Sequence, residues 1–370
     1  MGNPFKPTAG AEPPYLIGRE HSLDLFTEGL EDGAGAPGLL NIISGPRGIG
    51  KTALLHRTEQ AALAQGWIAV SDTATPGLLG RIGRMVDNHL AKLGEGRVHR
   101  SVTGFQAGGF GITTQLAPEE QAGLRKHITV LVRMLDGHGT GLLLTVDEIH
   151  SVDRAELAQL AAIVQHLVRD SLPIALVVAG IPKAVSDLLN DDVATFLRRA
   201  DPIILADVPV AAVKDSMRET FGGTGVFIGE DHLQAAAEAT GGYPFLIQLV
   251  GYHVWRLSKE SGVTDDTLLR GVEAARRRLG SMVLATTLAD LSEVDRTFLL
   301  KMAADDGPSA IADIAARMGQ STKYAGVYRK RLMDAGVIRP AGRGRVRFAV
   351  PHLAEYLRNH AAQLHEPGLA

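Results

Sequence analysis

Short apolar runs alternate with longer amphipathic stretches over the first 206 residues of the chain. Five runs have the length and composition of strands buried on both faces of a sheet: residues 39–44, 67–71, 142–146, 174–179 and 202–205. Four stretches around them carry apolar residues at helical spacing: residues 20–30, 53–63, 78–93 and 121–135. Strands that alternate with helices predict an α/β fold built on a doubly wound parallel sheet.

The hydrophobic pattern changes after residue 206. Helical spacing alone continues from there, which predicts a small all-α domain, at residues 210–221, 231–240, 244–260 and 264–279. The last part predicts three helices, a hairpin and a final helix: residues 293–303, 310–318, 322–335, 337–350 and a helix after Pro351. We interpret this order as a winged helix-turn-helix.

These changes divide the chain into a flexible tail (1–14), an α/β domain (15–206), an all-α domain (207–283) and the winged helix-turn-helix (284–365). The tail is expected because four prolines interrupt it. A glycine-rich segment at residues 97–115 interleaves its glycines with apolar residues, and it is compatible with either an exposed β-hairpin or a mobile surface loop.

The composition is that of an ordinary globular protein, with 45% hydrophobic and 21% charged residues in 370. The chain has no cysteine, which excludes disulfides and thiolate zinc sites. Its net charge of −3 carries no signal for nucleic acid over the whole chain, so local charge has to decide that question. No apolar run approaches the length of a membrane span, and the first residues lack a signal-peptide core. We therefore expect a cytoplasmic protein with no membrane partner.

The segment after the first apolar run fits the phosphate-binding loop pattern G-x-x-x-x-G-K-[ST] at every fixed position. It consists of Gly45, Pro46, Arg47, Gly48, Ile49, Gly50, Lys51 and Thr52, and Ala53 continues into the helical stretch. The glycines let backbone N–H groups face phosphate oxygens, and the helix adds the positive end of its dipole. Lys51 is expected to neutralise the β- and γ-phosphates of ATP, and Thr52 to ligate Mg²⁺. An ordinary glycine-rich turn is the alternative, which the flanking strand and helix disfavour.

A second motif ends the apolar run at residues 142–146, where Asp147 and Glu148 follow. This is the Walker B arrangement. Asp147 is expected to hold Mg²⁺ through water beside Thr52, and Glu148 to orient and polarise the attacking water. Phosphoryl transfer needs mainly positioning and neutralisation of charge, so these few residues are sufficient for it.

Together these features resemble the AAA+ ATPases, in particular the branch near origin-recognition initiators, and the archaeal-type and STAND ATPases. Residues 17–20 look like the motif that lines the adenine pocket, which implies nucleotide contacts from Ile17, Gly18 and Arg19. Residues 241–244 resemble the glycine–proline motif that opens a lid helix, which implies the same for Tyr243 and Pro244. The resemblance covers nearly the whole chain. It implies a P-loop NTPase domain with ATP and Mg²⁺, a helical lid and a winged helix.

Two positions depart from the AAA+ pattern. Gly180 stands where many members carry a polar sensor of the γ-phosphate. The lid helix lacks an arginine at the usual second sensor position, because Arg256 lies about three turns further along. Both departures fit the STAND-like variant, and they predict slow intrinsic hydrolysis.

For two further sites the sequence allows either a catalytic role or an ordinary surface position. Arg198 and Arg199 precede the fifth run and resemble the position of an arginine finger that acts on a neighbouring subunit. The alternative is a solvated helix end, where arginine is favourable against the dipole. His150 is either a second group behind the Walker B acids or, as we favour, a surface histidine.

The predicted winged helix carries a strong local charge. Residues 321–347 hold eight basic residues and one acid, Asp334, for a local net charge of +7. The candidate DNA contacts are Lys323, Tyr324, Tyr328, Arg329, Arg331, Arg343 and Arg345. Lys323 and Tyr324 stand near the start of the predicted recognition helix, and Arg343 and Arg345 stand in the wing. The alternative is a protein-contact domain that docks on its own ATPase module.

Three hypotheses follow. The first is an AAA+ ATPase that binds duplex DNA through its winged helix and assembles with ATP as a homo-oligomer or with a partner protein. The second is a STAND-like nucleotide switch whose winged helix controls a protein partner. The third is a nucleotide-binding adaptor with negligible turnover.

Overall fold

The computed structural model describes residues 2–8, 10–93, 118–190, 195–259 and 262–361. The glycine-rich segment at 97–115, predicted as a hairpin or a surface loop, lies outside these residues.

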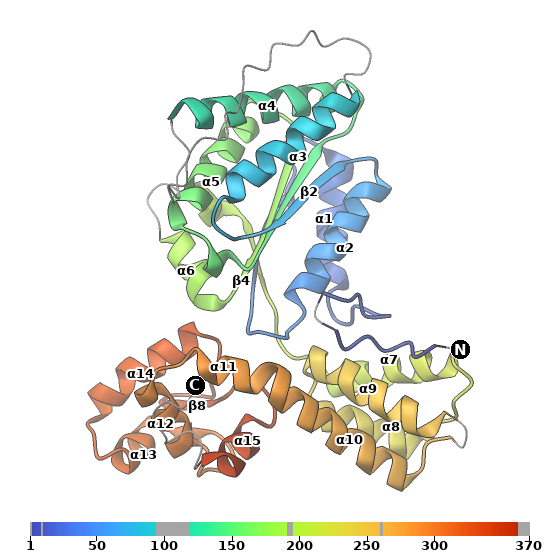
Figure 1. The fold of residues 1–370 in the computed structure, drawn as a ribbon, viewed down its shortest axis with the longest axis vertical. Coiled ribbons are helices and arrows are strands. Elements are labelled where there is room, and N and C mark those ends of the chain that lie inside the picture. Colours follow the sequence, from blue (N-terminus) through green and yellow to red (C-terminus); the bar gives the residue numbers. More distant parts are fainter. Residues whose placement is uncertain (1, 9, 94–117, 191–194, 260–261, 362–370) are drawn as a thin grey trace, which may run out of the picture.

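A five-stranded parallel sheet forms the centre of the N-terminal half (Figure 1). Its strands are β1 (Leu40–Ser44), β2 (Ile68–Thr73), β3 (Leu142–Asp147), β4 (Ile174–Gly180) and β5 (Asp201–Ile204), in the order β2-β3-β4-β1-β5. All neighbours are parallel, as the alternating pattern predicts. The three central strands are almost completely buried, which explains their unbroken apolar sequences.

Helices cover both faces of this sheet. One layer consists of α1 (Glu20–Asp32) and α2 (Lys51–Ala64), and the other of α3 (Leu78–Leu93), α4 (Pro118–Asp136), α5 (Arg154–Arg169) and α6 (Pro182–Leu189). Successive side chains of a strand point to opposite faces. Leu143 therefore packs in the core that includes α1 and α2, whereas Leu142 and Leu144 pack in the core of α3 to α6. A doubly wound α/β fold is confirmed.

The next part of the chain is helical, as predicted. It consists of α7 (Val210–Gly222), α8 (Glu230–Thr240), α9 (Pro244–Ser258) and α10 (Asp265–Leu279). One π-helical turn, η3 (Gly280–Leu284), and the short α11 (Ala285–Ala289) continue α10 without a break (Figure 1).

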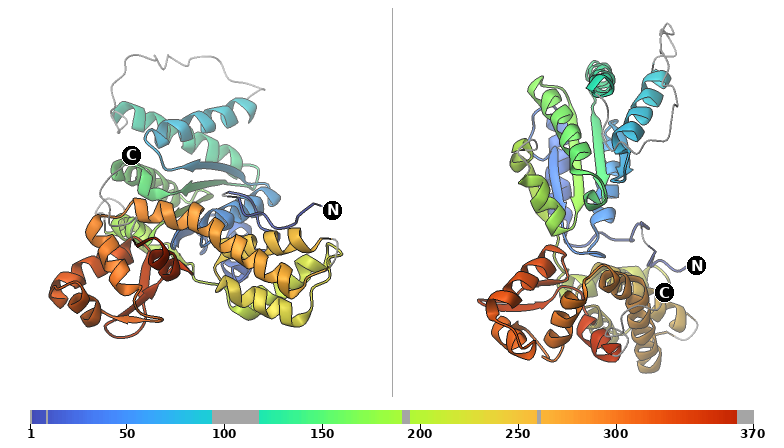
Figure 2. Two further views of the ribbon diagram at one scale, coloured as in Figure 1. Left: turned by 60° about the horizontal axis from the view of Figure 1, so that its bottom comes forward. Right: turned by 60° about the vertical axis from the view of Figure 1, so that its left-hand side comes forward.

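The C-terminal module, residues 292–361, contains the helices and hairpin that the sequence predicts. Its elements are α12 (Glu293–Met302), β6 (Ser309–Ala310), α13 (Ile311–Arg317), α14 (Thr322–Asp334), β7 (Ile338–Pro340), β8 (Arg345–Phe348) and α15 (Leu353–Asn359). The strands form an antiparallel sheet in the order β6-β8-β7, of which the two-residue β6 is too short to leave a sequence signal. This module and helices α7–α10 lie side by side below the sheet (Figures 1 and 2).

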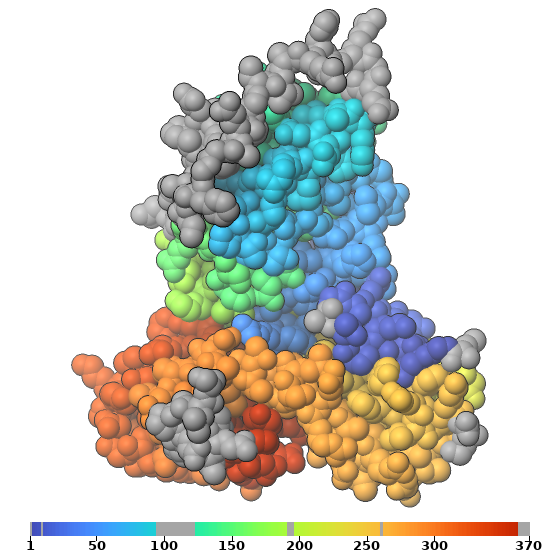
Figure 3. Space-filling model, in the orientation of Figure 1, coloured from blue at the N-terminus to red at the C-terminus, as the bar shows by residue number. Residues whose placement is uncertain are grey.

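The N-terminal strap, residues 2–8 and 10–15, differs from the flexible tail that its prolines predict. The Phe5 side chain is 2% exposed, and its ring packs on Phe221 at a centroid distance of 5.3 Å. A Cβ on Gly251 of α9 would lie 2.2 Å from that ring, so the glycine makes room for it. Asn3 Nδ2 also donates a hydrogen bond to the Tyr252 carbonyl at 3.0 Å. Figure 3 shows the strap, in dark blue, lying between the α/β domain and the yellow helices. An apolar anchor thus holds the segment down, and the prolines give it an extended path.

Across the described ranges, no helix combines the length and the hydropathy that a membrane crossing requires.

Candidate nucleotide-binding site

Three neighbouring strands end in residues of the predicted site. β1 is followed by Gly45, β3 ends at Asp147 and is followed by Glu148, and β4 ends at Gly180. Because the strands are parallel, their carboxyl ends meet at one edge of the sheet, where α/β proteins bind ligands. The Gly45 N–H donates to the Gly180 carbonyl at 3.3 Å, which fixes the start of the loop against the neighbouring strand.

The loop has the conformation that a phosphate site requires. Gly48 and Gly50 have φ values of 73° and 95°, in the left-handed region that favours glycine. α2 begins at Lys51, whose side chain is buried with 5% exposure and donates to the carbonyls of Gly45 and Pro46 at 3.1 and 3.0 Å. Burial lowers the pKa of Lys51, although the nearby Walker B carboxylates act in the opposite direction. A buried ammonium bonded only to carbonyls fits a site that takes an anionic ligand.

Two oxygen donors from different elements meet beside this lysine. The Thr52 hydroxyl donates to Asp147 Oδ2 at 2.6 Å. Hydroxyl and carboxylate oxygens are the ligands that Mg²⁺ prefers, and it usually takes only one or two protein groups together with phosphate oxygens. No cluster of three acidic, histidine or cysteine side chains that could hold a metal occurs in the part of the chain described. Thr52 and Asp147 therefore fit Mg²⁺ carried in with a nucleotide rather than an ion caged by protein alone.

Glu148 lies directly after the strand in an unusual backbone conformation. Its φ and ψ are 54° and 44°, uncommon for a residue with a side chain, and its N–H donates to Asp147 Oδ1 at 2.8 Å. His150 Nδ1 lies 3.1 Å from Glu148 Oε2, and the His150 side chain is 22% exposed. This histidine is therefore in contact with the Walker B glutamate, rather than a plain surface residue as favoured from the sequence.

The two departures from the AAA+ pattern have a structural basis. At Gly180 a Cβ would lie 2.5 Å from the Ile149 side chain, so this isoleucine occupies the space that a sensor side chain would need. Arg256 lies in the last turn of α9, exposed, and about 18 Å along the helix from Pro244. Neither position supplies a polar group to the γ-phosphate from within this chain.

A pocket of about 360 Å³ opens at the loop. Among the predicted nucleotide-binding residues, its walls include Ile17, Arg19, Pro244 and residues 47–53. Gly18, Gly45, Pro46 and Tyr243 do not line it. Glu148 and residues of the N-terminal strap also contribute to the walls, so the pocket joins the catalytic edge of the sheet to the strap.

Tyr243 acts on the loop from behind. It is completely buried, and its hydroxyl donates a short hydrogen bond to the Arg47 carbonyl. Burial raises the pKa of Tyr243, which keeps the phenol protonated as a donor. Phe245 N–H donates to the Gly48 carbonyl at 3.3 Å. The start of α9 thus holds the phosphate loop, a role that the glycine–proline motif does not reveal by itself.

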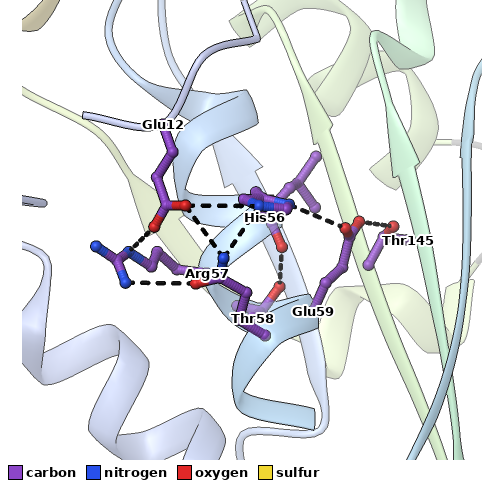
Figure 4. Close-up of polar contacts among 8 residues, drawn as sticks. Glu12, His56, Arg57, Thr58, Glu59 and Thr145 are labelled. Carbon is purple, nitrogen blue, oxygen red and sulfur yellow. Dashed lines mark hydrogen bonds and ion pairs between the residues drawn. The ribbon is translucent and has the colours of Figure 1, made fainter. Parts of the chain in front are cut away.

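The N-terminal strap is tied to both Walker elements through a polar network (Figure 4). Glu12 accepts from Arg57 Nε at 2.9 Å and lies 3.7 Å from His56 Nε2. On the other side of that imidazole, Glu59 lies 3.5 Å from Nδ1 and accepts from the Thr145 hydroxyl at 2.6 Å. Thr145 lies on β3 two residues before the Walker B aspartate. The network therefore links the strap, the helix after the loop and the strand of the second motif.

Arg198 and Arg199 lie at the opposite end of the sheet from the loop. Both are exposed in a short 3₁₀ helix, η2 (Thr195–Arg199), and Arg198 Nε donates to the Leu189 carbonyl at 2.6 Å. β5 then begins at Asp201, which pairs with Asn41 near the start of β1. The loop follows the far end of β1, so these arginines could reach only the nucleotide of another molecule.

Several candidate DNA contacts are exposed on the C-terminal module. Lys323 lies at the start of α14, and Arg343 and Arg345 lie in and beside the turn between β7 and β8. Tyr324 and Tyr328 pack against each other on the helix with tilted rings, at a centroid distance of 5.0 Å, and their hydroxyls are 3.3 Å apart.

Other basic residues of the module are used internally. Arg331 donates to the buried carboxylate of Asp295 at 2.9 Å, which pins α14 to α12. Arg339 of β7 forms a short ion pair with Asp207, which precedes α7. Arg329 is half-buried. The sequence could not separate these residues from the exposed ones, because their acidic partners lie far away along the chain.

The C-terminal module and the residue just before it, Asp290, also touch the phosphate loop. Arg47 forms an ion pair with Asp290 at 3.0 Å. Gly336, between α14 and β7, approaches the loop so closely that a Cβ there would lie 3.2 Å from Pro46 Cα. A domain docked on its own ATPase module was one alternative from the sequence, but no motif indicated which residues would make the contact.

Comparison with known proteins agrees with the geometry of the loop. Residues 15–178 match a family described as the AAA ATPase domain. Residues 281–357, from the π turn onward, match a family described as a domain of unknown function, DUF8462. No curated protein matches the sequence.

Solved structures resemble the whole chain in fold. A Walker-type ATPase of Pyrococcus abyssi is 14% identical with a TM-score of 0.68, over 93% of this chain and 96% of that one. The ORC2 protein of Aeropyrum pernix, solved in ADPNP–ADP complexes, is 16% identical with a TM-score of 0.61, over 97% and 98% of the two chains. At such identities the likeness concerns the fold alone.

Proposed function

We propose, from the premise that this chain is an ATP-hydrolysing enzyme of the AAA+ P-loop class, that its bound nucleotide controls a winged helix that binds duplex DNA. In this proposal the winged helix is the C-terminal module, with α14 as its recognition helix and the β7–β8 turn as its wing.

The catalytic roles follow from the positions of four side chains. Lys51 would neutralise the β- and γ-phosphates, and Thr52 and Asp147 would hold Mg²⁺, which adds positive charge at the transferring phosphoryl group. Glu148 would polarise the attacking water, and His150 lies beside its carboxylate at 3.1 Å. Neither of the two sensor positions, Gly180 and Arg256, supplies a polar group to this site, so we expect slow turnover in the isolated molecule.

The observation that carries DNA binding is a group of basic side chains without acidic partners. Of the residues that the structure describes, none forms an ion pair with Lys323, Arg343, Arg345 or Arg347, which are all exposed. Lys330, by contrast, pairs with Asp334 at 2.8 Å. Arg345 donates only to the Pro308 carbonyl, at 3.4 Å. Guanidinium and ammonium groups that are not in ion pairs neutralise phosphates and release counterions, which is the main source of affinity for DNA.

The contacts between the phosphate loop and the C-terminal module support control by nucleotide. Arg47 and Pro46 belong to the loop that would receive the phosphates. Arg47 pairs with Asp290, just before the module, and Pro46 lies close to Gly336 of the module. A nucleotide that shifts the loop would therefore bias the position of the module, and by linkage DNA would bias the nucleotide affinity.

Assembly is a separate part of the proposal. Arg198 and Arg199 are exposed at the end of the sheet that faces away from their own nucleotide pocket. An arginine finger supplied to a second copy fits this position, and it would explain why the isolated chain lacks a sensor.

The test of DNA binding is a titration of mixed-sequence duplex DNA at several salt concentrations, with ATP, with ADP and without nucleotide. If roughly five basic residues meet phosphates, log affinity should fall against log salt with a slope of about −4 to −5. Arg343→Ala with Arg345→Ala should flatten the slope by up to ~2 and weaken binding to all sequences alike. The matched control is Arg270→Ala with Arg277→Ala, two exposed arginines of α10, which should leave the slope unchanged. No binding at low salt in any nucleotide state would remove DNA from the function.

The docked position of the module also favours a second candidate, the STAND-like switch. There the same contacts would hold the module on the ATPase domain with ADP and release it with ATP to recruit a protein partner. Protection from hydrogen exchange at residues 321–347 with ADP, together with no DNA binding, would select this candidate.

A further inference from the structure

The helix that joins α10 to the C-terminal module contains a π-helical turn. α10, η3 and α11 run in line from Asp265 to Ala289 (Figure 1). The residues on either side of η3, Leu279 and Ala285, keep helical φ values of −57° and −58°, so the helix widens without breaking. Such turns carry one extra residue, cost hydrogen-bond geometry and are frequent at functional sites.

The two faces of this turn meet different parts of the molecule. Met282 and Val283 line the nucleotide pocket. Gly280 lies against α15, where an added Cβ would be 3.0 Å from the Tyr356 ring, and Leu284 is buried with 1% exposure. The wider turn thus presents two apolar side chains to the pocket while Gly280 stays packed against α15.

The pocket lining combines polar and apolar side chains. Lys51 and Thr52 belong to the phosphate loop and its helix, Arg19 and Gln248 add polar groups, and Ile17, Phe245 and the two side chains of the π turn are apolar. A nucleotide likewise combines charged phosphates with a flat, largely apolar base. With its phosphates on the loop, the nucleotide would extend its nucleoside along the apolar walls.

We propose that Met282 and Val283 contact the nucleoside of the bound nucleotide, so that the helix carrying the C-terminal module forms one wall of the nucleotide site. This rests on the assignment of the pocket to ATP. Asp290, just beyond α11, reaches the same site through its ion pair with Arg47. One short stretch of helix therefore meets both the nucleoside and the phosphate loop, and nucleotide stabilises the docked module through the contacts it makes with residues 282 and 283.

The test compares ligands with and without a nucleoside. In the full chain, Met282→Ala with Val283→Ala should weaken MgATP and MgADP binding about tenfold by calorimetry, because apolar contact area is lost. Binding of inorganic tripolyphosphate should not change, since it meets only the loop. The matched control is Ser281→Ala with Thr286→Ala, two exposed hydroxyls of the same stretch that do not line the pocket, which should leave all three ligands unaffected. Unchanged ATP affinity, or an equal loss for tripolyphosphate, would overturn the proposal.

A second measurement uses the unmodified protein. ATP should slow amide hydrogen exchange at residues 280–284, whereas tripolyphosphate at equal saturation should not. Equal protection by both ligands, or by neither, would contradict a nucleoside contact. The assignment of the pocket is tested apart from this by Lys51→Ala, which should weaken all three ligands. If Lys51→Ala bound ATP as tightly as the wild type, the pocket assignment itself would fail.

Discussion

At the scale of single residues, the conformation of the phosphate loop depends on glycines that leave room for neighbouring side chains, as well as on charged residues. Gly48 combines a left-handed φ with a position where a Cβ would lie 2.1 Å from the Tyr243 hydroxyl oxygen. Motif spacing predicted Gly48, Lys51, Thr52, Asp147 and Glu148, and the fold brings their elements to one edge. The spacing could not reveal the tyrosine behind the loop, because that bond joins residues 196 positions apart.

Two substitutions separate these backbone effects. Gly48→Ala should weaken ATP binding at least tenfold, because the methyl group forces both the loop and the Tyr243 ring to move. Tyr243→Phe keeps the ring and loses only the bond to the Arg47 carbonyl, so a smaller loss is expected. Nucleotide titration of both variants checks this order. A larger loss for Tyr243→Phe would show that the hydrogen bond matters more than the space.

Substitutions of the charged groups should affect ATP binding and ATP hydrolysis separately. Lys51→Ala should abolish tight ATP binding, because the cation that faces the terminal phosphates is lost. Glu148→Gln should keep binding and stop hydrolysis, because only the activation of water is lost. Calorimetry measures ATP binding by each variant, and phosphate release measures hydrolysis. The control is Lys214→Ala, which removes a lysine that pairs with Glu230 in the helical part of the chain. Equal ATP affinity for Lys51→Ala and the wild type would refute the site.

At the scale of elements, apolar runs predicted all five strands to within about two residues, since both faces of the sheet are covered. The N-terminal strap was mispredicted because proline content says nothing about a single aromatic anchor. Phe5 packs into a site made by Phe221 and Gly251, which lie more than 200 residues away. The π turn was also not predicted, since the helix expected from the sequence ended at residue 279 and no helix was expected for residues 280–289.

The strap should contribute measurably to stability. Phe5→Ala removes a ring that is 2% exposed, and it should lower the free energy of unfolding by about 3 kcal/mol. Phe227→Ala is the matched control, because that ring is 76% exposed and its loss should change stability by about 0.5 kcal/mol or less. Denaturant unfolding of the two variants provides the comparison. If the Phe5→Ala variant were as stable as the control, the strap would be a flexible tail, as its prolines predict.

At the scale of the whole molecule, one apolar core runs from α1 and α2 through helices α7–α10 into the C-terminal module. Ion pairs at Arg47–Asp290 and Arg339–Asp207 cross the same junction. The order of the parts could be predicted from the sequence. Docking could be given only as an alternative, because the residues that make it are surface pairs distant in the sequence. The domain boundaries at residues 206 and 283 remain predictions, and the continuous core suggests that neither would be a free hinge.

The proposed arginine finger can act only in an assembly, where a second copy of the chain supplies it. If Arg198 or Arg199 acts on a neighbour's γ-phosphate, the double Ala variant should bind ATP normally and hydrolyse it up to ~10³-fold more slowly, the scale of arginine fingers. Both residues are exposed at the end of β5 away from their own loop, so we expect no direct effect on their own site. Mixing this variant with Glu148→Gln should restore part of the turnover, because one kind of mixed interface then contains both an intact glutamate and intact arginines.

Arg154→Ala with Lys183→Ala, which removes two exposed cations paired with Asp187, serves as the control and should leave turnover unchanged. If the Arg198 and Arg199 variant hydrolyses ATP at the wild-type rate over a range of protein concentrations, both residues are solvated ends of the η2 helix and the trans interface must lie elsewhere.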